Sequence, residues 1–182
     1  MSIWYGFLQE FTEICDPGSY GAIDTTFFDR ETASKHYQHH SDRHIRTLKT
    51  TVLVDLCAIL DIHFSAHWPH DTQTGRRVVL RNTEKIENIA SDRGYDDLSL
   101  RDALRSEGVW LLLRRRLFAV LHSRTQRTIG QRIYGQHWIA ETTFSAIKRQ
   151  VGPTVHPRAW YRDLRELMLI AAVYKLEQGL KQ

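Results

Sequence analysis

The order of predicted strands and helices is the feature that most restricts how this chain can fold. β-Branched and aromatic residues predict strands over residues 20–28, 47–55 and 59–65, and the short break between the last two fits an antiparallel hairpin. From Asp71, which can cap a helix, the spacing of apolar residues changes. It predicts helices that alternate with short apolar strands. Three strands followed by such an alternation predict a mixed five-stranded sheet with helices on both faces.

The later elements complete this α/β pattern. A helix is predicted to open over residues 96–98 and stop at Gly108, with Leu98, Leu100, Ala103 and Leu104 on its apolar side. The remaining predicted segments are a helix over 71–82, strands over 86–91 and 109–113, and helices over 131–150 and 157–178. This is the element order of a ribonuclease-H-like fold.

Length and composition place the chain in the class of single globular domains. Its 182 residues suit one domain, which we assign to residues 19–182 after a short N-terminal helix over 1–18. The sequence has no apolar run of about 20 residues, so no membrane span is predicted. Its first residues lack a basic stretch followed by an apolar one, so no secretory signal is predicted. The two cysteines, Cys15 and Cys57, are far apart, as expected for a cytoplasmic, nucleoid-associated protein rather than a disulfide scaffold.

Charge is distributed unevenly along the chain. Residues 1–100 carry 10 Lys+Arg against 15 Asp+Glu, whereas residues 101–182 carry 15 against 6. This polarity suits a protein that holds hard metal ions beside a polyanion, although a solvated surface with uneven patches gives the same totals.

Three carboxylates are candidate metal ligands. Asp24 lies in the middle of the first predicted strand, Asp92 at the end of the fourth, and Glu141 on the helix after the fifth. Apolar neighbours, Ala140 and Phe144 among them, place Glu141 close to a buried helix face, where a charged group needs a partner or a metal. Mg²⁺ takes such hard oxygen ligands, and a pair of ions can stabilise both the attacking and the leaving oxygen of a phosphodiester.

Several blocks of the chain resemble DDE transposases of bacterial and archaeal insertion sequences. The blocks are AIDTTFFDR over residues 22–30, PHD over 69–71 and SDRGYDD over 91–97. Tyr134, Glu141 and Lys148 are similar to the signature of the YREK subgroup: Tyr, two residues, Arg, three residues, Glu, six residues, Lys. The resemblance covers residues 20 to about 178.

The resemblance implies a ribonuclease-H-like catalytic domain that performs cut-and-paste DNA transposition with two Mg²⁺ or Mn²⁺ ions and no organic cofactor. Its partners would be double-stranded DNA, as transposon ends and as target, and a homodimer stays open. The implied metal-binding catalytic triad is Asp24, Asp92 and Glu141. The DNA-contacting residues are expected to be Tyr134, His137, Lys148, Arg149, Arg114 and Arg115.

Two departures from the family pattern lead to further expectations. His137 stands where the signature has arginine, and imidazole lacks the bidentate fork that arginine offers to phosphate. Nearby carboxylates would favour its protonated form and preserve part of the charge, so we expect slower, pH-sensitive cleavage. In addition, only 23 residues precede Asp24, which resembles a truncated copy that keeps the catalytic core and loses most of the end-recognition region.

Other functions remain open on the sequence. Histidine clusters at residues 36–44 and 67–71 allow a zinc site, although both cysteines lie outside them. A catalytically inactive DNA-binding remnant would use the cations of the second half on the phosphate backbone, with Trp138 and Trp160 either stacking on bases or, as we favour, packing in the core. A metal-dependent nuclease on the same fold is the third alternative. The basic residues that could line such a DNA groove are Arg114, Arg115, Arg116, Arg124, Arg127, Arg132, Lys148, Arg149, Arg158, Arg162 and Arg165.

Overall fold

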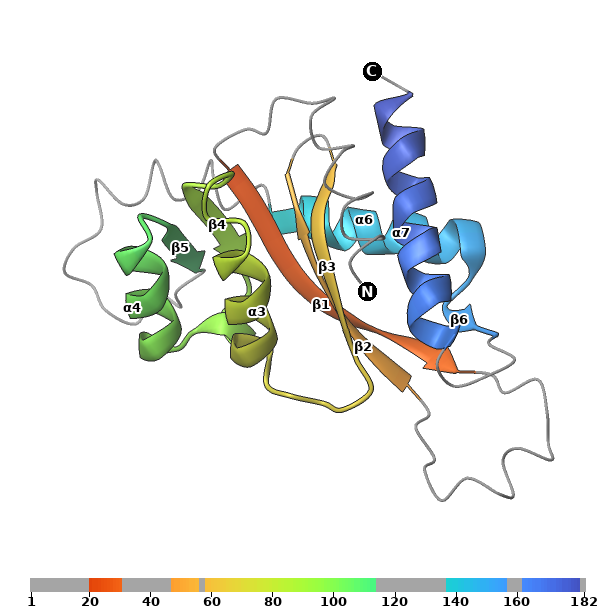
Figure 1. Ribbon diagram of the computed structural model, residues 1–182, viewed down its shortest axis with the longest axis horizontal. Coiled ribbons are helices and arrows are strands. Elements are labelled where there is room, and N and C mark those ends of the chain that lie inside the picture. The colour runs from red at the N-terminus through yellow and green to blue at the C-terminus, as the bar shows by residue number, and fades with distance from the viewer. Residues whose placement is uncertain (1–19, 31–46, 56–57, 114–136, 157–161, 181–182) are drawn as a thin grey trace.

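Five stretches of the chain are described by the computed structural model shown in Figure 1. They are residues 20–30, 47–55, 58–113, 137–156 and 162–180. Four predicted segments fall wholly or partly outside them: the helix over 1–18, the polar stretch 31–46, the start of the helix over 131–150 and the start of the last helix.

A mixed sheet forms the centre of the fold. Its strands lie in the order β3-β2-β1-β4-β5, and the short β6 pairs with the far end of β1. β2 runs antiparallel to both β1 and β3, whereas β4 lies parallel to β1 and to β5. The strands are β1 (Tyr20–Arg30), β2 (Thr47–Val54), β3 (Ile59–Ser65), β4 (Asn88–Ser91), β5 (Trp110–Leu113) and β6 (Thr154–Val155). The predicted mixed sheet and its hairpin are confirmed.

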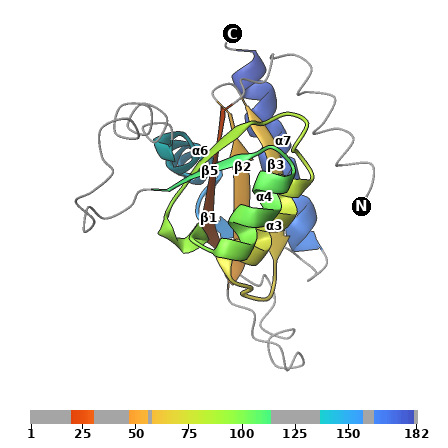
Figure 2. The same cartoon turned by 90° about the vertical axis from the view of Figure 1, so that its left-hand side faces the viewer.

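Helices cover both faces of the sheet, as predicted. The turn of 3₁₀ helix and α3 and α4 lie against one face, and α6 and α7 lie against the other (Figure 2). The helical elements are α3 (Asp71–Leu80), η2 (Arg93–Tyr95), α4 (Leu98–Ser106), α6 (His137–Val151) and α7 (Asp163–Gly179). No helix among the described residues combines the length and apolar character needed to cross a bilayer.

The alternation of β1 divides the core into two layers. Ala22 and Phe28 pack with α6 and α7, whereas Ile23 packs with α3 and α4. Because side chains of a strand point to alternate faces, Asp24 shares the α6 face with Ala22 and Phe28. β2 is buried along nearly its whole length, as expected for a strand with helices over both faces. The polar side chain of Asp24 is therefore set into an otherwise apolar layer.

Two local predictions are wrong. The residue that caps α3 is His70, whose Nδ1 accepts from the Thr72 amide at 3.4 Å, while Asp71 is the first helical residue and its carboxylate is engaged elsewhere. On α4, Leu100 and Leu104 are buried as predicted, but Leu98 is 75% exposed, because it lies at the first position of the helix, ahead of the buried turn. The other cap is as predicted: Asp97 accepts from the Leu100 amide at 2.7 Å.

Candidate active site

Asp24 and Asp92 come to the same level of the sheet from neighbouring parallel strands. Ala22 of β1 pairs with Ala90 of β4, and each aspartate follows its alanine by two residues. β4 ends at Ser91, so Asp92 stands immediately beyond the carboxyl end of its strand, where open α/β sheets place ligands. The two positions predicted from the strand pattern thus lie side by side across the sheet.

A backbone amide orients each of these carboxylates. The Thr25 amide donates to Asp24 Oδ1 at 2.7 Å, and the Gly94 amide donates to Asp92 Oδ1 at 2.8 Å. The second bond makes Asp92 the cap of the η2 turn. Both side chains are therefore held by their own segments rather than swinging freely.

The third predicted ligand, Glu141, lies on helix α6 and not on the sheet. Its side chain is 64% exposed, so it lies at the border of the helix and not on the buried face, which carries Ala140, Phe144 and Ile147. Its Oε1 lies 3.7 Å from Nε2 of His137, one helical turn earlier. His137 is buried, so its ring is shielded from bulk solvent and lies close to the Glu141 carboxylate.

The charges of the site act on one another. Burial raises the pKa of Asp24 from 3.8 to about 6, the Thr25 amide and the nearby His137 lower it, and the charges of Asp92 and Glu141 raise it further. Burial is the largest cause of this shift, and the two neighbouring carboxylates add to it because like charges disfavour ionisation of Asp24. All three predicted triad members and His137 therefore lie within electrostatic range of Asp24.

The donor set fits a hard divalent cation in its chemistry. Carboxylate oxygens are the ligands that Mg²⁺ and Mn²⁺ prefer, and a cation would offset the charges of Asp92 and Glu141 that add to the raised pKa of Asp24. Within the part of the chain that the structure describes, no three His, Cys, Asp or Glu side chains are grouped closely enough to hold an ion as they stand.

A fourth acidic residue, Asp71, lies beside the site, and its pairing with Lys49 was not predicted. Its Oδ1 pairs at 2.7 Å with Nζ of Lys49, a buried lysine of β2 that also donates to the carbonyl of Pro69. A Cβ built on Gly94 would stand 3.0 Å from Asp71 Oδ2 and 3.0 Å from Asp92 Oδ1, so both carboxylates border that glycine. The sequence signal was the buried-strand position of Lys49, a charge that needs a partner.

Of the predicted DNA-contacting residues, three are described. Lys148 Nζ donates to Thr26 Oγ1 at 2.7 Å and lies 5.3 Å from the centre of the Phe28 ring, which places it on the same face of β1 as Asp24. Arg149 is exposed at the end of α6, and His137 is buried as described above. Tyr134, Arg114 and Arg115 lie outside the described residues.

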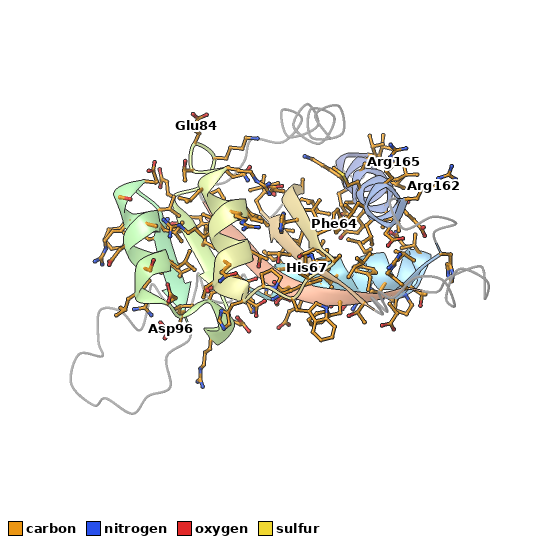
Figure 3. All side chains as sticks on the ribbon, turned by 60° about the horizontal axis from the view of Figure 1, so that its bottom comes forward. Phe64, His67, Glu84, Asp96, Arg162 and Arg165 are labelled. Carbon is orange, nitrogen blue, oxygen red and sulfur yellow. The ribbon has the colours of Figure 1, made fainter. Side chains whose placement is uncertain are left out.

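Other cations and aromatic residues from the sequence hypotheses are dispersed. Arg162 and Arg165 project from the start of α7, on the side of the molecule away from α3 and α4 (Figure 3). Trp138 is 59% exposed on the first turn of α6, so the expectation that it packs in the core is wrong. Arg116, Arg124, Arg127, Arg132, Arg158 and Trp160 lie outside the described residues.

The zinc alternative gains nothing from the described histidines. His67 is exposed, His70 caps α3, and Asp71 pairs with Lys49. The histidines of the cluster at 36–44 fall in the part of the chain that the structure leaves undescribed.

Comparison with protein families decides the relationship. The profile of the family described as Transposase DDE domain matches residues 17–176, which is most of the chain. The chain belongs to this DDE transposase family. No curated protein sequence matches it significantly. The predicted DDE transposase family is therefore confirmed, and the site described above lies in a DDE transposase domain.

One solved structure supports the fold of this DDE transposase domain. It is similar to a piggyBac transposase synaptic complex with hairpin DNA, with a TM-score of 0.56 and 12% identity over 91% of this chain and 47% of that chain. The chain thus spans about half the length of that transposase. Similarity to the catalytic domain of Mos1 mariner transposase has a TM-score of 0.41 and 7% identity, over 97% of this chain and 92% of that chain. The Mos1 mariner paired end complex with Mn gives 0.43 and 8%, over 100% and 60%.

Proposed function

We propose that this DDE transposase domain cleaves DNA strands and transfers the resulting 3′ ends into target DNA, using divalent metal ions held by Asp24, Asp92 and Glu141. The observation that carries the proposal is the placement of Asp24 on β1 and Asp92 just beyond β4 at the same level of the sheet, with Glu141 on α6 near enough for its charge to act on Asp24. Family membership supplies the chemistry for which such a cluster is suited.

The role of bound metal in this proposal follows from phosphodiester chemistry. Two Mg²⁺ or Mn²⁺ ions on these carboxylates would activate the attacking hydroxyl, first of water and then of a DNA 3′ end, and stabilise the leaving oxygen. The protein's own part is to keep the carboxylates ionised and oriented. The Thr25 and Gly94 amides orient Asp24 and Asp92, and the positive charge on His137 favours ionisation of Asp24.

Basic side chains near the site provide for the DNA backbone. Lys148 lies on the Asp24 face of β1 through its bond to Thr26, and Arg149 is exposed on the next position of α6. A phosphate that enters beside Asp24 would meet these charges, which attract DNA without reading its sequence. Duplex DNA, as transposon ends and as target, is therefore the proposed partner.

A nicking assay separates this proposal from an inactive DNA-binding domain. Supercoiled plasmid and duplexes carrying the two ends of the encoding element are incubated with Mn²⁺ or with chelator. We expect nicking only with Mn²⁺ and none with Asp92→Asn, which keeps the shape of the side chain but removes its charge. The matched control is Asp96→Asn. Asp96 lies in the same segment, but its side chain is exposed and pairs with Arg101 at the surface.

Three outcomes would contradict the proposal in different ways. Binding in chelator without any cutting would indicate the inactive DNA-binding remnant. Cutting without joining of the element ends to target DNA would indicate a metal-dependent nuclease. Equal cutting by wild type and Asp92→Asn would place the reaction at some other site.

A further inference from the structure

A chain of buried hydroxyl groups runs beneath the carboxylate site. The hydroxyls of Tyr95 and Thr25 lie 2.6 Å apart, and those of Thr25 and Thr51 lie 2.9 Å apart. Thr51 donates to Thr74 at 3.1 Å, and Thr74 donates to the carbonyl of Asp71 at 3.0 Å. The chain therefore connects four segments: the turn after β4, strand β1, strand β2 and the start of α3.

The direction of every bond in this chain is fixed by its last acceptor. A carbonyl can only accept, so the single proton of Thr74 is used on Asp71, and Thr51 must give its own proton to Thr74. Thr25 then has to donate to Thr51, which leaves Tyr95 to donate to Thr25. Hydrogen bonds aligned in one direction polarise and strengthen one another.

Tyr95 is also held by its ring. The side chain is 1% exposed, and its Cδ1 and Cε1 would lie 2.8 and 2.6 Å from a Cβ on Gly75, so the ring fills the space that this glycine leaves on α3. The backbone of Tyr95 closes the η2 turn, whose cap is Asp92. Ring, hydroxyl and backbone thus join the Asp92 turn to α3 and to β1 at the residue next to Asp24.

We propose that Tyr95 is a positioning residue that fixes the Asp92 carboxylate relative to Asp24 for metal binding, through its hydrogen bond to Thr25. It touches neither substrate nor metal in this role. The inference rests on the proposed function, because it assumes that Asp24 and Asp92 bind the ion. The charges of Asp24, Asp71 and Asp92 all act on the Tyr95 hydroxyl and, with burial, raise its pKa, which places the hydroxyl among these carboxylates.

The test removes the two ends of this hydrogen bond one at a time. Tyr95→Phe keeps the ring against Gly75 and deletes only the hydroxyl, and Thr25→Val deletes the acceptor with little change of volume. Binding of Mn²⁺ alone to the full chain is measured by the electron paramagnetic resonance signal of free Mn²⁺. We expect about a tenfold weaker apparent affinity in each variant, as for other groups that orient metal ligands.

The double variant shows whether the two groups act as one unit. If Tyr95 works through Thr25, Tyr95→Phe/Thr25→Val should bind Mn²⁺ no more weakly than Thr25→Val alone. The matched control is Tyr174→Phe, which removes a buried hydroxyl from α7 and should leave Mn²⁺ affinity unchanged. Thermal midpoints and DNA affinity in chelator are measured for every variant. They show whether a lower Mn²⁺ affinity comes from a general loss of structure.

Opposite results would overturn the inference. Wild-type affinity for Mn²⁺ in Tyr95→Phe, or losses that add in the double variant, would show that the tyrosine does not position Asp92. Failure of the proposed function looks different, because the wild-type chain would then bind no Mn²⁺ or Asp92→Asn would bind it equally well. That result would overturn the inference together with its premise.

Discussion

The imidazole of His137 lies 3.7 Å from the carboxylate of Glu141, one turn further along α6, and its charge acts on Asp24. In the family signature an arginine stands at this position, so a side chain that is always charged is replaced by an imidazole, which also has a neutral form. The histidine is buried next to the carboxylate site, so its charge acts mainly on the carboxylates of that site.

We therefore predict that His137→Arg accelerates Mn²⁺-dependent nicking and flattens its pH profile. Wild-type cleavage should depend on pH because imidazole has a neutral form as well as a charged one, whereas arginine stays charged throughout. His137→Gln, which is neutral at every pH, is the control and should be slow across the range. Identical rates and profiles for wild type and His137→Arg would contradict this prediction.

A second prediction concerns stability without metal. The pKa of Asp24 is about 6 in the folded chain, above its ordinary value of 3.8, so the folded state binds more protons than the unfolded state between these values. The contribution of Asp24 to stability is then fully present below about pH 4 and is lost as pH rises through about 6. Asp24→Asn removes this loss, and we expect it to raise the free energy of unfolding at pH 7 by about 1–2 kcal/mol.

Urea denaturation in chelator at several pH values measures this effect. The variant should lose part of the slope between pH 4 and 6.5, while the slope due to Asp163, whose pKa is also raised to about 6, remains. An unchanged slope would show that Asp24 ionises normally. With Mn²⁺ present the order should reverse, because ion binding stabilises the wild-type chain alone.

Much of this architecture follows from periodicity. The two-residue period of β1 places Asp24 on one face, and the end of the apolar run in β4 places Asp92 at a strand end, so both positions could be predicted. The pairing of Lys49 with Asp71 could not, because it depends on how the segment before α3 returns over β2. Nor could the exposure of Trp138, since a helical pattern that is apolar on several sides does not say which side meets the sheet.

The third prediction tests a buried ion pair at the other end of β1. Arg30 Nε lies 2.5 Å from Asp163 Oδ2 at the start of α7, and both side chains are buried. Burial raises the pKa of Asp163 despite this cation. Arg30→Met leaves the carboxylate without that cation, so we expect a loss of about 3–5 kcal/mol at pH 7.

The loss should shrink at pH 5, because the carboxylate of Asp163 can then take up a proton. Arg30→Met/Asp163→Asn should recover much of the stability at pH 7, since neither member of the pair then carries a charge. Chemical denaturation at both pH values measures this. An equal loss at pH 5 and pH 7 would attribute the effect to packing of the arginine stem instead.

The fourth prediction uses the two helical glycines of α3 and α7. Gly75→Ala places a methyl group within 2.8 Å of two atoms of the Tyr95 ring, so we expect a loss of about 1–3 kcal/mol from overpacking. Gly179→Ala meets nothing within 4 Å at the end of α7 and should be neutral or stabilising by up to about 1 kcal/mol. Thermal unfolding distinguishes them, and equal midpoints would mean that the ring can move aside.

The last prediction concerns the DNA backbone. Arg149 is exposed beside Lys148 on α6. Arg105 belongs to α4, on the other face of the sheet, and its guanidinium lies 5.1 Å from the centre of the Trp110 ring. If DNA lies along the Asp24 face, Arg149→Gln should weaken binding in chelator and reduce the slope of log affinity against log salt by about 1. Arg105→Gln should leave both unchanged, although it removes the same charge. Fluorescence anisotropy with a labelled duplex at 50–200 mM salt, a range over which phosphate contacts change affinity by roughly 10³-fold or more, measures the slopes. Equal effects of the two variants would show that charge alone, and not the face of α6, attracts the DNA.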